Sequence, residues 1–410
     1  MIYEAYQTQA DLLAPLREMA RGIGRAAGGL PRQGTFRRLA AACELFSRGT
    51  LSHGRPSFSI DKVVVDGREV RVTEEPAHVT PFGTLLRFRK DINTPQPRVL
   101  LVAPLSGHFS TLLRGTVQTM LPEHDVYITD WHNARDVGVR HGRFGFEDYI
   151  DHVIRFLEVI GPGGHVLAVC QPCVQVLAAV AVMAETNNPA APRSMTLMAG
   201  PIDTRINPTE VNRLATERSI DWFEQNLIAT VPPRYPGGRR KVYPGFMQLL
   251  AFMSMNLERH VKAHLDLYDN LARGEIEKAE TIKAFYDEYF AVLDLPAEFY
   301  IETVRIVFQD CLLPKGELTF RGKPIEPRAI RRTALLTVEG AVDDMCAPGQ
   351  TEAAHGLCTG LAPERRRHHL QQGVGHYGVF AGSRWESEIY PVVRAFIAAH
   401  DTARTVAPHF

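Results

Sequence analysis

The chain has 410 residues, of which 46 are Lys or Arg, 46 are Asp or Glu, and 45% are hydrophobic. This composition is typical of a folded globular protein and excludes disordered, fibrous and collagen-like chains. The formal net charge is zero and no long basic run occurs, so the chain lacks the positive surface on which nucleic-acid binding depends. Its length suits one large domain with an insertion, or two domains.

Residues 1–27 predict an amphipathic helix, with apolar residues at helical spacing: Leu12, Leu13, Leu16 and Met19. The stretch lacks the uninterrupted apolar segment of a signal peptide, and no window approaches the roughly 20 apolar residues that span a bilayer. Six cysteines are scattered along the chain, unlike the dense pattern of a disulfide-stapled secreted domain. We therefore expect a cytoplasmic protein.

Residues 59–88 alternate in hydrophobicity, and Asp66-Gly67 predicts a tight hairpin turn between antiparallel strands. From about Val99 onward, short apolar runs alternate with helical patterns, as in a parallel α/β sheet. The predicted strands are 99–104, 125–130, 165–170, 194–200, 334–340 and, more weakly, 366–373. The predicted helices between them are 110–121, 146–160, 172–184, 349–357 and 387–399.

Between Ile202 and about Ala329 this alternation stops, and long helical patterns follow one another. Because the segment lies between two predicted strands of one sheet, we expect an inserted helical cap. The predicted fold class is therefore α/β: a mostly parallel sheet with helices on both faces and an inserted helical cap. Residues 1–201, including the N-terminal helix, and 330–410 would form the sheet domain, and residues 202–329 would form the cap.

The segment from 163 to 183 is the most informative, because a buried strand leads directly into Cys170 and a helical pattern begins at Pro172. On such a sharp turn a nucleophile projects above the sheet, with a helix N-terminus beneath it. That setting, with a neighbouring His, can lower a thiol pKa from about 8.5 to roughly 3.5–7.5. The frame from Ala168 to Pro172 matches G-x-S-x-G with Cys in place of Ser. We therefore predict that Cys170 is a nucleophile.

Three other interpretations of this cysteine remain open. Cys170 could be a small buried apolar residue at the end of a strand. With Cys173 it forms a C-x-x-C pattern, which can be a redox dithiol or half of a zinc site. No second pair of cysteines or histidines has zinc-site spacing, which disfavours the metal.

Two later strands supply partners for a nucleophile. Asp343 and Asp344 follow the strand at 334–340, and His376 lies in a glycine-flanked loop after the last predicted strand. The order nucleophile, acid, His is that of the α/β-hydrolase triad. Open α/β sheets bind ligands at the carboxyl ends of their strands, where all these residues fall. The alternative is that the acids only cap a loop and His376 has no catalytic role.

A tetrahedral oxyanion needs backbone N–H donors, one after the nucleophile and one after an early strand. Gln171 takes the first position, and Leu105 and Ser106 take the second. Three further side chains at this edge of the sheet are predicted to bind substrate: His108, Trp131 and His132. His108 could instead cap the next helix, and Trp131 could serve packing alone.

Four segments carry a family resemblance: VCQPCVQVLAAV, LVAPLSGHFSTLLRGTVQTMLPEHDVYITDWHNARDV, LLTVEGAVDDMCAPGQTEAAHGLC and QQGVGHYGVFAGSRW. They resemble the intracellular polyhydroxyalkanoate (polyhydroxybutyrate) depolymerases over nearly the whole chain. The resemblance implies the α/β-hydrolase fold with an inserted helical cap. It also implies a carboxylic ester hydrolase that cleaves stored, amorphous polyester through a thioester on Cys170. It also implies that His376 is the general base and acid and that Asp343, rather than Asp344, orients it. Cys173 departs from the small residue expected there, so a reversible disulfide with Cys170 stays open.

The partner that the resemblance implies is a polyhydroxyalkanoate granule, at whose surface the cytoplasmic protein would work. A strongly apolar run in the cap could close the site or meet such a surface, or could be ordinary core: Phe246, Met247, Leu249, Leu250, Phe252, Met253 and Met255. No motif requires a metal or an organic cofactor. Homo-oligomerisation stays open.

Two rival functions are compatible with the same motifs. Polyhydroxyalkanoate synthases resemble the chain at the Cys elbow, but they carry glycines where Pro172 and Cys173 stand here. A non-catalytic granule-surface protein would use the apolar cap to adsorb while the triad is vestigial.

Overall fold

A nine-stranded sheet organises the computed structural model, which describes residues 2–28, 34–255 and 257–401. The strand order is β1-β2-β3-β5-β4-β6-β7-β13-β14. The strands are β1 (Lys62–Val65), β2 (Arg68–Val79), β3 (Gly83–Lys90), β4 (Arg98–Val102), β5 (Asp125–Trp131), β6 (His165–Val169), β7 (Ser194–Met198), β13 (Ala334–Gly340) and β14 (Arg366–Gln371). From β5 to β14 all neighbours are parallel, whereas β1 to β3 form antiparallel pairs and β3 meets β5 antiparallel.

The hairpin between β1 and β2 follows the predicted turn. Asp66 and Gly67 both have positive φ, at 49° and 76°. Two residues of positive φ make the type I′ turn, whose twist matches that of the flanking strands.

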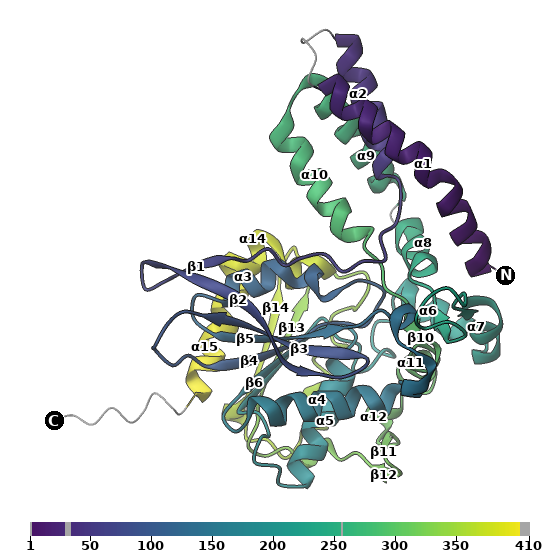
Figure 1. Ribbon diagram of the computed structural model, residues 1–410. Coiled ribbons are helices and arrows are strands. Elements are labelled where there is room, and N and C mark those ends of the chain that lie inside the picture. The colour runs from purple at the N-terminus through teal and green to yellow at the C-terminus, as the bar shows by residue number, and fades with distance from the viewer. Residues whose placement is uncertain (1, 29–33, 256, 402–410) are drawn as a thin grey trace.

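Both faces of the parallel sheet are buried, which explains the continuous apolar runs. Along β4, Leu100 and Val102 belong to one hydrophobic cluster and Val99 and Leu101 to the other, since successive side chains point to opposite faces. The first face is covered by α4 (Phe146–Ile160) and α5 (Cys173–Glu185). The second is covered by α3 (Arg114–Met120) and α15 (Tyr390–His400), as Figure 1 shows.

A long segment between β7 and β13 interrupts the sheet. It contains α6 (Glu210–Glu217), α7 (Ile220–Leu227), α8 (Gly245–Met255), α9 (Leu257–Arg273), α10 (Ile276–Tyr289), α11 (Ala297–Thr303) and α12 (Leu312–Lys315). It also contains a small antiparallel sheet of β8 (Ala229–Thr230), β9 (Lys241–Tyr243) and β10 (Leu295–Pro296) and a hairpin of β11 (Thr319–Phe320) and β12 (Lys323–Pro324). The sheet and its helical insertion form the α/β-hydrolase fold that the sequence predicted. Helix α7 and the small strands were not predicted.

The two N-terminal helices, α1 (Ile2–Gly28) and α2 (Gly34–Arg48), pack against each other, and α2 packs against α9. With α9 and α10 they form an arm that projects from the α/β domain (Figure 1). The sequence-based division had assigned residues 1–201, including these two helices, to the first part of the sheet domain. The apolar face predicted for α1 is also turned outward, because Leu12, Leu16 and Met19 are exposed. No helix in the described parts of the chain combines the length and apolarity needed to cross a membrane.

Candidate active site

The turn after β6 holds Cys170 in a strained backbone conformation. Its φ is 66°, in the left-handed region that non-glycine residues rarely adopt. Its N–H donates to the carbonyl of Met198 on the adjacent strand at 2.8 Å, and its carbonyl accepts from the N–H of Cys173 at 3.1 Å. The helix α5 begins at Cys173, one residue after the predicted start. This sharp turn places the partly exposed Cys170 in the lining of a cavity above the sheet.

The elbow fits because Gly200 leaves space beside it. A Cβ at position 200 would lie 2.2 Å from the Cβ of Cys173 and 2.9 Å from the carbonyl oxygen of Cys170. Contacts that short do not occur, so only glycine fits without moving the turn. Gly200 lies two residues after the end of the neighbouring strand β7, outside the elbow motif that marks Cys170 in the sequence.

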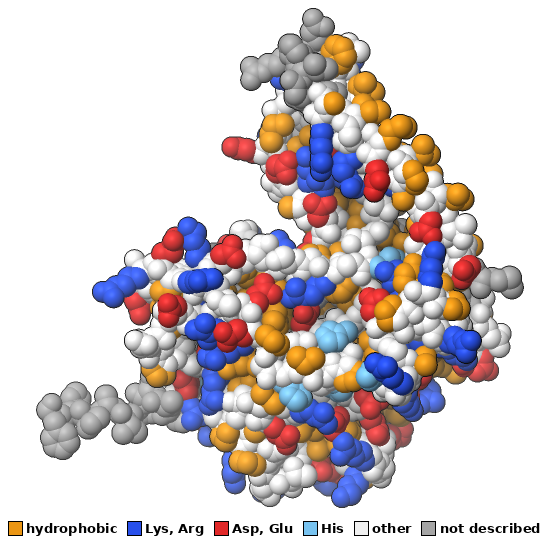
Figure 2. Space-filling view, viewed as in Figure 1, with side chains coloured by type: hydrophobic (Ala, Val, Ile, Leu, Met, Phe, Trp, Pro, Cys, Tyr) orange, Lys and Arg blue, Asp and Glu red, His pale blue; other side chains and the backbone are white. Residues whose placement is uncertain are grey.

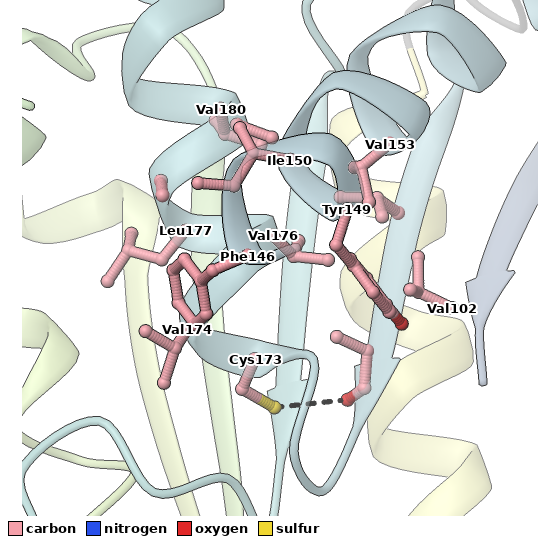
Figure 3. Close-up of a cluster of buried hydrophobic side chains, with 14 of the residues drawn as sticks. Val102, Phe146, Tyr149, Ile150, Val153, Cys173, Val174, Val176, Leu177 and Val180 are labelled. Carbon is pink, nitrogen blue, oxygen red and sulfur yellow. Dashed lines mark hydrogen bonds between the residues drawn. The ribbon is translucent and has the colours of Figure 1, made fainter. Parts of the chain in front are cut away.

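Cys173 belongs to the hydrophobic core rather than to the reacting groups. Its side chain is fully buried under α4 and α5, and its Sγ donates weakly to the carbonyl of Ala168 at 3.5 Å (Figure 3). Burial raises the pKa of this thiol well above its usual value, and the charge of Cys170 adds to the effect. A protonated core thiol suits neither half of a zinc site nor a redox dithiol.

The loops after β13 and β14 bring an acid and a histidine together. His376 Nδ1 lies 2.8 Å from Asp343 Oδ2, and both side chains are buried. The other carboxylate oxygen, Oδ1, accepts the N–H groups of Met345 and Cys346, each at 2.8 Å. Asp344 is exposed. Of the two acids between which the sequence left a choice, Asp343 is therefore the one that contacts the histidine.

Opposing effects act on the proton affinity of His376. Burial lowers its pKa, but the charge of Cys170, hydrogen bonds with Asp343 and Cys170, and the charge of Asp343 all raise it. The balance is a pKa well above the usual value for histidine. A histidine that keeps its proton beside a cysteine is the partner that stabilises a thiolate.

The loop after β4 lies beside the elbow and lines the same cavity. The N–H of Leu105 donates to the side-chain Oε1 of Gln171 at 3.3 Å, a long hydrogen bond. The Nε2 of Gln171 is buried and has no hydrogen-bond partner among the described residues. The carbonyl of Ser106 accepts a hydrogen bond from Gln248 of α8. Gln248 was not foreseen, since no motif marks it, and it ties the inserted segment to this loop.

The cavity has a volume of about 550 Å³ and an almost entirely apolar wall. Cys170, His376, Gln171, Leu105 and Ser106 all line it. The inserted segment contributes most of the rest, including Trp222, Phe223, Met247, Phe252, Phe299 and Tyr300. Such a pocket, with a few polar groups converging at one end, suits an apolar ligand that carries one reactive polar bond.

Three predicted substrate-binding side chains lie outside this lining. His108 is buried, and its Nε2 contacts the carbonyl of Tyr289 at 3.1 Å. The indole N–H of Trp131 donates to the carbonyl of Ala103 within an aromatic cluster under the sheet. His132 contacts Thr84 Oγ1 at 2.9 Å. The positions of these residues at strand ends predicted the correct edge of the sheet. Their side chains, however, pack in the interior or point toward neighbouring strands rather than into the cavity.

One group of potential metal ligands occurs among the described residues: Glu339, Glu352 and His368. The carboxylate of Glu339 already accepts the backbone N–H groups of Gly349, Thr351 and Glu352 at 2.7–3.0 Å. It serves as a cap for this turn. None of the three side chains lines the large cavity.

Comparisons with known proteins gave one family match and several structural similarities at low identity. Residues 199–401 match the family model described as "PHB de-polymerase C-terminus". The chain is also similar to a putative lipase from Acinetobacter baumannii AYE, at 12% identity over 80% of this chain and 93% of the other, with a TM-score of 0.42. It is similar to a carboxylesterase from Nitrososphaera gargenis, at 12% identity over 83% and 98%, with a TM-score of 0.41. The comparison with curated proteins gave no match.

Proposed function

The chain belongs to the PHB depolymerase family, whose model matches residues 199–401, and on that premise we propose that it hydrolyses the ester bonds of poly(3-hydroxybutyrate) or a related polyhydroxyalkanoate. The observation that carries the proposal is the grouping of Cys170, His376 and Asp343. These residues follow three parallel strands. Cys170 and His376 line the apolar cavity, and Asp343 contacts His376. Nucleophile, base and orienting acid in this order suit acyl transfer.

In the proposed reaction the Cys170 thiolate attacks the ester carbonyl carbon. The N–H groups of Gln171 and of the Leu105–Ser106 loop donate to the resulting oxyanion. For Leu105 this means exchanging its long bond to the Gln171 side chain for the stronger charged acceptor. The C–O bond then breaks, and the leaving alkoxide takes the proton of His376. A thioester on Cys170 results.

Water completes the cycle. His376, now neutral, takes a proton from a water molecule, whose oxygen attacks the thioester carbonyl. The C–S bond breaks, the hydroxy acid or a short oligomer leaves, and the thiolate and the protonated His376 are restored. Asp343 keeps the imidazole in the orientation that both proton transfers need.

The alternative of a synthase-like acyltransferase shares this thioester and differs only in the acceptor, since an alcohol would replace water. The alternative of a non-catalytic granule protein has less support, because the buried Asp343–His376 pair and the strained elbow are kept in a reactive arrangement.

The test is release of 3-hydroxybutyrate from amorphous poly(3-hydroxybutyrate) granules by the parent protein, Cys170→Ala and Cys173→Ser. We expect the parent to be active, Cys170→Ala to lose at least about 10⁴-fold of the rate, and Cys173→Ser to keep turnover. An inactive parent that still adsorbs to granules would contradict the hydrolase. Loss of activity in Cys173→Ser at unchanged stability would instead favour a dithiol mechanism.

A further inference from the structure

Helix α1 carries a line of side chains that packs against the rest of the arm. Along the helix these residues repeat at alternating spacings of three and four: Tyr3, Tyr6, Ala10, Leu13, Arg17, Ala20 and Gly24. All are buried or half-buried. Tyr3 and Tyr6 contact Phe246 of α8 with ring centroids at 5.6 and 4.0 Å, and Gly24 lies against Cys43 of α2. This inner line is the helix-packing seam of α1 within its own chain.

A second line with the same alternating spacing lies one residue earlier and is uncovered. It consists of Ile2, Ala5, Gln9, Leu12, Leu16, Met19, Ile23 and Ala26, all of which are exposed. Its large members are exposed by 42% (Ile23) to 72% (Leu12). Figure 2 shows hydrophobic side chains gathered along the outer edge of the arm, where α1 runs in Figure 1.

The outer line fits a helix better than a flat surface. Apolar residues at alternating spacings of three and four form the narrow seam through which two helices interlock. Thr8, Pro15 and Gly22 border it on one side and are small or uncharged, so another helix can approach closely. A helix that lies on a lipid or polymer surface usually shows a wider apolar face with Lys or Arg along its borders.

We propose that the occupant is α1 of a second copy of this chain, packed antiparallel across a two-fold axis. In that arrangement Leu12 of one copy faces Leu16 of the other. Ala5 faces Ile23 and Ile2 faces Ala26, so a large side chain meets a small one in each of these outer layers. Facing positions of complementary size are what a packed helix pair requires, and a two-fold contact uses the same surface twice.

The charges of α1 favour the antiparallel direction. Glu4 lies near its N-terminus, whereas Arg21 and Arg25 lie near its C-terminus, and all three are exposed. Antiparallel packing brings Glu4 of one copy toward the arginines of the other, and parallel packing would bring like charges together. With 27 residues the helix is about 40 Å long, so the seam extends along one whole side of the arm.

The first test is the mass of the full chain in solution by sedimentation velocity. We expect the parent to be dimeric at micromolar concentration and the double variant Leu12→Glu/Leu16→Glu to be monomeric. The matched control is Leu257→Glu/Leu265→Glu on α9, whose side chains are similarly exposed, at 58% and 62%, but lie outside the outer line. This control should stay dimeric. Equal turnover of a soluble ester and a single cooperative unfolding transition would show that all variants are folded.

A monomeric parent would overturn the proposal. If that monomer bound amorphous polymer granules and the α1 variant did not, the outer line would be a polymer-docking face instead. A dimer that survives the α1 substitutions but dissociates on the α9 substitutions would also overturn it.

The second test fixes the direction of packing by disulfide cross-linking. Ala5→Cys and Ile23→Cys should cross-link when the two variants are mixed and oxidised, but not when each is oxidised alone. The parent chain, whose own cysteines remain, sets the background. Efficient cross-linking of Ala5→Cys with itself would indicate a parallel pair and contradict the proposed arrangement.

Discussion

In the segment from β6 through α5 nearly all apolar side chains are buried, whereas α1 leaves five large ones exposed along one line. The first segment lies at the centre of the sheet and is covered on both faces by helices of the same chain. The second has one seam covered by α2 and α8 and an equivalent seam without a cover. The elbow therefore has all its packing partners within one chain, while α1 is complete only in the presence of another surface.

The difference separates the function that a single chain can support, which is catalysis at the elbow, from association, which needs a second surface. The backbone strain at Cys170 persists because the surrounding core fixes it, as strained functional residues require. In the arm, a change in exposed residues leaves that core untouched. Substitutions at the elbow should thus alter chemistry and stability, and substitutions on the outer line should alter association.

The largest expected effect is a loss of turnover on substitution of the buried acid Asp343, compared with its exposed neighbour Asp344. Asp343→Asn removes the carboxylate that holds His376, so turnover should fall by about 10²- to 10⁴-fold. Asp344→Asn, at an exposed position one residue away, should change turnover less than about twofold. Steady-state hydrolysis of a soluble 3-hydroxybutyrate ester measures both. Equal losses in the two variants would contradict the assignment of Asp343.

The same substitution, Gly to Ala, should have opposite effects in the two regions. Gly200→Ala forces a Cβ into the elbow and should lower the free energy of unfolding by about 1–3 kcal/mol or more, with loss of turnover. Gly22→Ala lies inside α1, where no atom beyond the neighbouring turns of the helix is within 4 Å of the new Cβ in the single chain. It should therefore raise the stability of the monomeric chain by about 0.5–1 kcal/mol. Urea unfolding gives both values. A Gly200→Ala variant as stable as the parent would show that the elbow is not crowded.

The contact between α1 and the rest of the chain should make the stability of the protein depend on pH. The Tyr3 hydroxyl donates to the buried Asp294 at 2.5 Å, and burial raises the pKa of that carboxyl to about 6. The folded chain then binds the proton more tightly than the unfolded chain, so this group makes stability fall as pH rises from about 4 to 6, by up to about 3 kcal/mol.

Asp294→Asn removes this titration. The free energy of unfolding of the parent minus that of the variant should therefore decrease between pH 4 and pH 7, measured by denaturant unfolding. A difference that is constant with pH would contradict the raised pKa. Both chains carry the same remaining titratable groups, so those groups cancel in the comparison.

The strands and the elbow could be predicted from sequence because local patterns determine them. Continuous apolar runs mark strands covered on both faces, and Asp66-Gly67 marks a turn of positive φ. Cys170, Asp343 and His376 could be grouped because the carboxyl ends of parallel strands share one edge. The structure places Asp343 in contact with His376, and His376 and Cys170 in the lining of one cavity.

Side-chain direction could not be predicted in the same way. His108, Trp131 and His132 lie at the expected edge, but hydrogen bonds to distant groups turn them away from the cavity. Periodicity predicted the helix α1 without indicating which of its apolar residues are covered. Gln248 and Gly200 act through contacts with segments far away in the sequence, and no local pattern marks either residue.

The central step of the proposed reaction is the formation of a covalent intermediate on Cys170. Its direct measurement is the mass of the protein after it is mixed with a short 3-hydroxybutyrate ester and quenched in acid, followed by peptide mapping. The account predicts a 3-hydroxyacyl adduct on the Cys170 peptide that hydroxylamine removes. An adduct on another residue, or turnover by Cys170→Ala, would contradict it.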